Sequence, residues 1–354
     1  MNLRYLIIMT IAGVSLLAQT FPAPHLTQWW DGGNVIRILD TYPQKLQRID
    51  VQGKSLNSLA SLAGVRNHWY LDGRAFAYVR EKQKGLLYES VNFGPWHLTN
   101  QIDGNQSIEA PHQLFPIGNG RFLGWNPGGF TASEKASYFA IFSSKANDNI
   151  EFSNLLDMGL KEPLLVKAAT GNGRSFQKNP KMARMSTSLG ISGDFQVFPG
   201  DDGVVLAHFW TGRFIFINPK GSIKRIVQLY NLTEAELGSF DTEVAIVDAQ
   251  PTVDGQILIC ARTEEAVKQN PKLFQTKGTV EQMKAPGGWD ALQQRRSDAL
   301  KADPRLMWFL LDTSEGTLKE TLPPPGAPNS IWDLRIFMKF RFVLLGNGHI
   351  FNPS

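Results

Sequence analysis

The sequence predicts an all-β protein, a six-bladed β-propeller built from four-stranded antiparallel blades. Three observations support this prediction: an apolar burst that recurs six times, a tight turn after nearly every copy, and a composition rich in turn residues. The 354 residues include 32 Gly and 20 Pro, with 42% hydrophobic and 19% charged residues. This composition favours a folded, strand-rich protein over a helical or disordered one.

The repeat is clearest between Gln196 and Leu229, QVFPGDDGVVLAHFWTGRFIFINPKGSIKRIVQL, where turn sequences separate three apolar bursts. The first burst, FQVF, matches five other segments: TQWW (27–30), NHWY (67–70), HQLF (112–115), AQPT (249–252) and LRIF (334–337). A unit that recurs in this way indicates a repeat architecture. Since each unit is too small to bury its own faces, we expect the units to pack around an axis, with these six segments as innermost strands.

The turns and the later strands of each unit follow the same pattern. The first burst leads into a tight turn and a second burst, as in LDGRAFAYV and GDDGVVLAHF. Gly adopts positive φ and Asp bonds its own backbone, so we interpret the Asp201-Asp202 pair as a hairpin turn and not as a catalytic carboxylate pair. A third burst and a weaker outer strand complete most units. The last unit lacks an outer strand, which we expect residues 19–26 to supply; a three-stranded final blade is the alternative.

The domain prediction is a single propeller over residues 19–354. The repeats are unevenly spaced, which indicates insertions at about residues 159–193 and 263–304. The second insertion contains the helix-like segments EEAVKQ and DALQQRRSDALKAD, so we expect a helical insertion in the fifth blade.

Residues 1–18 are predicted to be a signal peptide. Arg4 precedes an apolar run over residues 6–18 that is short for a membrane span and typical of a signal-peptide core. Cleavage after Ala18 and retention as a membrane anchor are both open. The sequence thus predicts an exported protein, periplasmic or extracellular, with no transmembrane segment in the mature chain. Cys260 is the only cysteine, which rules out an intramolecular disulfide, and we expect it to be buried.

The charge pattern does not indicate a nucleic-acid partner. The net charge is +4, and no Lys/Arg block with interleaved aromatic residues is present. No serine nucleophile elbow, zinc-binding HExxH sequence or phosphate-binding glycine loop occurs either. We therefore expect no cofactor, and the ligand or partner, protein or small molecule, is open.

Each predicted innermost strand carries a polar residue among apolar neighbours, and these are the candidate axial residues: Gln28, His68, Gln113, Gln196, Gln250 and Arg335. Two interpretations are open. The side chains line a polar channel that binds a ligand, or they pair with one another, with backbone groups and with channel water.

Three carboxylates occupy a common position two residues before the candidate axial residues of the last three units: Asp194, Asp248 and Asp333. Three carboxylates from successive blades would suit a divalent cation such as calcium, or would hold a proton at raised pKa for acid–base chemistry. The alternative is that each Asp caps the entry to its strand.

The segment GRFIFINPKGS resembles the third strand of six-bladed propellers of the NHL-repeat and gluconolactonase-like kind. The resemblance covers nearly all of residues 19–354, and it is one of repeat architecture. In gluconolactonase-like propellers it implies an axial metal held by an early glutamate with Asn and Asp residues. Here no Glu precedes Glu81, and the first inner strand offers Gln28.

Two functions follow from these patterns. The first is a binding or interaction module that engages a ligand or partner at one mouth of the axis. The alternative is a metal-dependent hydrolase, lactonase- or esterase-like, that uses the three aspartates.

Overall fold

The computed structural model describes most of the predicted strands. The described segments are 28–31, 34–39, 45–50, 54–81, 83–104, 109–132, 135–145, 148–156, 195–209, 212–231, 246–252, 255–269, 286–287, 291, 306–324, 326–327, 342–343 and 350–351.

Five four-stranded antiparallel sheets follow one another along the described part of the chain. The first contains β1 (Gln28–Asp31), β2 (Asn34–Leu39), β3 (Lys45–Ile49) and β4 (Ser55–Ala60). The second contains β5 (Val65–Leu71), β6 (Arg74–Glu81), β7 (Lys84–Val91) and β8 (His97–Asp103). The third contains β9 (Gln113–Gly118), β10 (Arg121–Ala132), β11 (Lys135–Ser144) and β12 (Ile150–Leu155).

The fourth and fifth sheets repeat this order. The fourth contains β13 (Phe195–Gly200), β14 (Gly203–His208), β15 (Arg213–Ile217) and β16 (Ile223–Gln228). The fifth contains β17 (Ile246–Pro251), β18 (Gln256–Arg262), β19 (Leu306–Asp312) and β20 (Leu318–Thr321).

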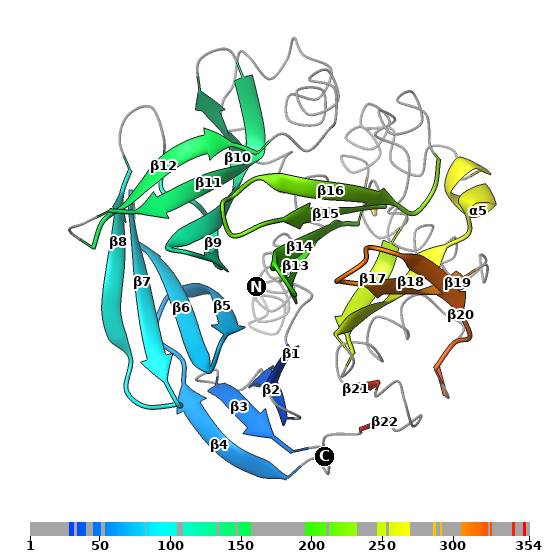
Figure 1. The fold of residues 1–354 in the computed structure, drawn as a ribbon, viewed down its shortest axis with the longest axis horizontal. Coiled ribbons are helices and arrows are strands. Elements are labelled where there is room, and N and C mark those ends of the chain that lie inside the picture. The colour runs from blue at the N-terminus through cyan, green and yellow to red at the C-terminus, as the bar shows by residue number, and fades with distance from the viewer. Residues whose placement is uncertain are drawn as a thin grey trace.

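The sheets are arranged as in a propeller. Figure 1 shows them around a common centre, with the first strand of each sheet nearest the centre and the fourth at the periphery. This confirms a nearly all-β, propeller-like fold and places five of the six predicted inner segments on first strands.

A sixth blade stays a prediction. In the described part of the last unit, β21 (Phe342–Val343) pairs with β22 (Ile350–Phe351), and Figure 1 shows this pair between the fifth and first sheets. The predicted sixth inner strand at 334–337 and the closing segment 19–26 lie outside the described residues.

The hairpin turns have the predicted chemistry. Asp72 and Gly73 have φ of 50° and 77° between the paired residues Leu71 and Arg74. Positive φ at both turn positions matches the right-handed twist of the strands it joins. Asp201 and Asp202 lie between the paired residues Gly200 and Gly203, which confirms that they form a hairpin turn.

Aromatic side chains on the inner strands join the first four sheets. Trp29 contacts Trp69 with ring centroids 6.1 Å apart, Trp69 contacts Phe115 at 5.5 Å, and Phe115 contacts Phe195 at 6.2 Å. All three contacts are edge-to-face, a geometry worth about 0.5–1.5 kcal/mol per pair beyond burial. We call this series the aromatic arc; it joins the first strands of the first four sheets, from β1 to β13.

The second insertion is described at its start, where helix α5 (Glu264–Gln269) follows β18. The described residues contain no helix of the length and apolarity that a bilayer crossing requires. Cys260 on β18 is completely buried, as expected, and burial together with the Asp248 carboxylate raises the pKa of its thiol.

Candidate axial site

The candidate axial residues that the structure describes lie on first strands. Gln28 is on β1, and the other four are His68 on β5, Gln113 on β9, Gln196 on β13 and Gln250 on β17. These last four side chains are buried, at 2–5% exposure. The side chain of Gln28, and all of Arg335, lie outside the described parts. The structure thus brings buried polar groups to the inner strands of four successive sheets.

Gln196 and Gln250 share one property. They are 2% and 4% exposed, yet among the described residues neither the oxygen nor the nitrogen of either carboxamide has a hydrogen-bond partner. Leaving a buried polar group unpaired costs about 1–3 kcal/mol. A group that hydrogen-bonds these carboxamides would therefore remove this cost.

His68 is a neutral group at physiological pH. Its Nε2 lies 3.0 Å from the hydroxyl of Ser61, and its ring lies beside Trp96 at a centroid distance of 6.3 Å. Burial lowers the pKa of His68 to about 4. Since an uncharged imidazole keeps one donor and one acceptor nitrogen, His68 adds hydrogen-bonding capacity without charge.

Asn67 is a buried carboxamide with a structural role that the sequence did not reveal. Its Nδ2 donates to the Leu114 carbonyl at 2.9 Å, and the Leu114 N–H donates to its Oδ1 at 3.0 Å. These reciprocal bonds join β5 to β9 of the next sheet. In the segment NHWY it was His68 that matched the axial pattern. Nothing in the local sequence shows that Asn67 is the residue that bonds the next sheet.

The aspartate position is described in one unit. Asp248 on β17 is 2% exposed, and its Oδ1 accepts a hydrogen bond from the Ala249 N–H at 2.7 Å. The ladder has a register shift between Ile246 and Asp248, so this carboxylate lies at a β-bulge. Asp194 and Asp333 lie outside the described segments, and within those segments no group of three His, Cys, Asp or Glu side chains is arranged to hold a metal. The three-aspartate site stays a prediction.

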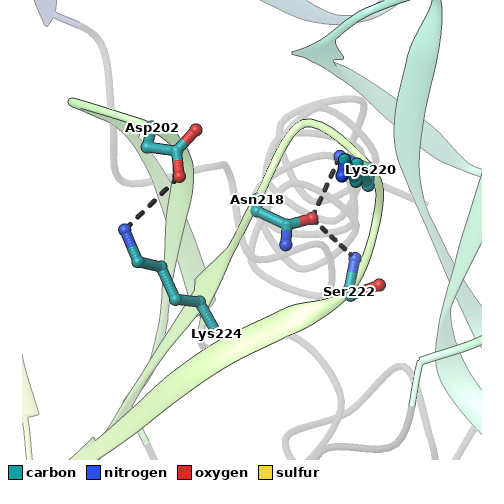
Figure 2. Close-up of polar contacts among 5 residues, drawn as sticks. All are labelled: Asp202, Asn218, Lys220, Ser222 and Lys224. Carbon is teal, nitrogen blue, oxygen red and sulfur yellow. Dashed lines mark hydrogen bonds and ion pairs between the residues drawn. The ribbon is translucent and has the colours of Figure 1, made fainter.

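The segment GRFIFINPKGS has a structural role in the turn from β15 to β16. Figure 2 shows Asn218 Oδ1 accepting hydrogen bonds from the backbone N–H groups of Lys220 and Ser222, at 3.0 and 3.1 Å. Beside this turn, Lys224 Nζ lies 3.3 Å from Asp202 Oδ2. Asn218 therefore stabilises the turn by the side-chain-to-backbone bonding typical of Asn and Asp.

Similar bonds from backbone N–H groups to an Asp side chain occur in the turns after two other third strands. Asp50 Oδ1 accepts from the Lys54 N–H at 2.8 Å after β3, and Asp312 Oδ1 accepts from the Ser314 and Glu315 N–H groups at 2.8 and 2.9 Å after β19. Hydrogen bonds from the Ser314 side chain and from this backbone lower the pKa of Asp312. The Asn or Asp that follows these third strands is thus explained by its role in forming the turn.

Comparisons with known proteins do not identify a family. No family model matches the chain, and no curated protein matches it. The chain is similar to a protein of unknown function from Bacteroides caccae, with 14% identity, coverage of 82% of this chain and 78% of that chain, and a TM-score of 0.33. A proposed 6-phosphogluconolactonase from Bacteroides uniformis gives 11% identity, 79% and 78% coverage, and a TM-score of 0.32.

A third similar structure is BamB from Moraxella catarrhalis, with 10% identity, coverage of 66% of each chain and a TM-score of 0.21. All three TM-scores are below 0.5. These similarities therefore give no activity or partner to this chain.

Proposed function

We propose that this protein is an exported binding module that engages a ligand or partner along the central axis of a six-bladed propeller. The observation that carries the proposal is the unpaired state of Gln196 and Gln250 on neighbouring inner strands. Buried carboxamides are normally hydrogen-bonded, so these side chains are candidates to hydrogen-bond a polar ligand at the axis. Concave sites with a few convergent polar groups are where proteins usually bind small ligands.

A second candidate function rests on the buried carboxylate of Asp248. If Asp194 and Asp333 lie at the same mouth, the three carboxylates would suit a calcium-dependent hydrolase of the lactonase or esterase type. The chemistry there would be polarisation of a carbonyl or activation of a water by the bound cation.

Metal analysis and thermal melting separate the two functions. For the binding module we expect no stoichiometric calcium in the purified protein, and calcium should leave the melting temperature unchanged. For the hydrolase we expect about one calcium per chain, hydrolysis of a simple lactone or nitrophenyl ester, and loss of both in an Asp194→Asn/Asp248→Asn/Asp333→Asn variant. Calcium-dependent stabilisation in the wild type but not in this variant would replace the binding proposal with the hydrolase, because binding to the native state raises its stability.

A further inference from the structure

The outer strand of the first sheet, β4, differs from the other outer strands in exposure and in charge. We propose that the protein forms a weak homodimer in which β4 of one chain pairs edge to edge, in antiparallel orientation, with β4 of a second copy. This inference goes beyond the axial function and does not depend on it.

β4 is the most exposed of the five described outer strands. It ends the first sheet next to β3, and Figure 1 shows it at the periphery of the ring. Five of its six residues are exposed, and the exposed fraction of Leu56 is 46%. In β8, β12, β16 and β20, no more than half of the residues are exposed. A partner can therefore reach β4 from solvent.

β4 also lacks the charged side chains that commonly protect a strand edge. Its sequence, SLNSLA, contains no charged residue. Charges on an outer strand, Lys above all, keep proteins from pairing through their edges. Each of the other described outer strands has at least one exposed charged side chain: Asp103 on β8, Glu151 on β12, Lys224 on β16, and Lys319 and Glu320 on β20. Among the described outer strands, β4 alone lacks this protection.

The absence of charge favours a second copy as the partner over a strand of another protein. A different protein could bring opposite charges to a charged edge, so its choice would not be confined to an uncharged strand. In a two-fold dimer the same strand lies on both sides, and in β16 this would bring Lys224 and Arg225 against their own copies. Like charges in facing positions destabilise a strand pair. Two β4 strands bring no charge into the pair and cover the exposed side chain of Leu56.

The available part of the edge is short. Trp96 Nε1 donates to the Ala60 carbonyl at 2.8 Å, so a side chain of the second sheet already contacts the end of β4. Residues 57–60 pair with β3 without interruption, and the register shifts next to Leu56. Because one short strand from each copy buries little area, we expect a weak dimer, with a dissociation constant of about 100 µM.

The test measures the oligomeric state of the purified mature protein by sedimentation equilibrium, at concentrations from about 5 to about 500 µM. Ser58→Lys and Ser58→Glu place a charge on an exposed side chain of β4. Ser153→Lys is the matched control, because Ser153 is an exposed serine on the outer strand β12. Thermal melting at the lowest concentration checks that each variant is folded.

We expect the wild type and Ser153→Lys to associate with the same dissociation constant. Each Ser58 variant should associate at least about tenfold more weakly, since like charges then enter the strand pair. An equal mixture of Ser58→Lys and Ser58→Glu should associate at least as well as the wild type, because opposite charges then lie across the pair. All melting temperatures should match that of the wild type. If a Ser58 variant melts at lower temperature, Leu56→Ser takes its place, with the same expected loss of association.

Three outcomes would overturn the inference. A wild type that stays monomeric up to the highest concentration excludes self-pairing and leaves the β4 edge to a strand of another protein. A dimer that persists unchanged in the β4 variants uses another surface. A mixture of the two Ser58 variants that stays monomeric shows that β4 meets a different part of the second copy. The axial function would stand in each case, because the calcium and ligand measurements test it separately.

Discussion

The two sides of the central axis treat the same chemical group in opposite ways. On the side of β5 and β9, the Asn67 carboxamide is fully paired with the backbone of Leu114. On the side of β13 and β17, the Gln196 and Gln250 carboxamides are as deeply buried and have no partners among the described residues. The first arrangement stabilises the contact between two sheets, whereas the second leaves these groups without a protein partner among the described residues.

The aromatic arc differs between the first four sheets and the fifth. It runs from Trp29 through Trp69 and Phe115 to Phe195 on β13, and no aromatic residue occurs on β17, whose sequence is IVDAQP. The arc therefore covers the paired side and ends at β13, beside Gln196, and it does not reach β17. Proteins often accept local instability where they bind, so the proposed binding function would use the side of β13 and β17.

The largest test of this comparison is Asn67→Leu. Leucine has a branched shape similar to that of asparagine but a larger volume, and it leaves both the N–H and the C=O of Leu114 without their partner. We expect a loss of about 2–4 kcal/mol in the free energy of unfolding, because each buried unpaired group costs about 1–3 kcal/mol. Urea denaturation measures this loss.

The matched variant is Gln196→Met, in which the same kind of group is removed from the unpaired side. It should cost nothing measurable in the same urea experiment. Equal losses in Asn67→Leu and Gln196→Met would show that the two sides do not differ, and the comparison would fail.

The sequence predicted the strands and turns better than the pairing of the side chains. Asp-Gly turns and alternating apolar bursts act locally, so the hairpin at Asp72-Gly73 and the turn at Asp201-Asp202 were predictable. The partner of Asn67 lies 47 residues away in another sheet, and its identity depends on how two blades pack. The unpaired state of Gln196 and Gln250 depends in the same way on neighbours that no local pattern specifies.

The next test uses pH on the paired side. Burial lowers the pKa of His68 from 6.5 to about 4, so between these values the unfolded chain binds a proton that the folded protein does not. The free energy of unfolding should therefore fall as the pH falls from about 6.5 towards 4. At pH 5 the His68 contribution to this loss is about 2 kcal/mol.

His68→Gln should remove this part of the pH dependence in urea denaturation between pH 7 and pH 5. His112 will retain a similar part, because burial, with Arg66 and Arg80 nearby, also lowers its pKa to about 4. Gln196→Met carries no titrating group on the unpaired side and should keep the wild-type pH dependence. A His68→Gln variant with that same pH dependence would show that His68 is not held neutral by the fold.

The smallest effect is expected at Asn218, whose carboxamide is paired like that of Asn67 but lies at a solvent-exposed turn. Asn218→Ala removes its bonds from the Lys220 and Ser222 N–H groups, which water can then replace. We expect a loss of about 1 kcal/mol in the free energy of unfolding, below that of Asn67→Leu because the freed groups are not left unpaired in the core. Lys224→Ala, which removes the ion pair with Asp202 between side chains 48% and 56% exposed, is the control and should change stability by less than about 0.5 kcal/mol. If Asn218→Ala destabilised the protein as much as Asn67→Leu, burial would not set the cost of an unpaired carboxamide partner. The argument that Gln196 and Gln250 await a ligand would then lose its physical basis, because it depends on that cost being large only in the interior.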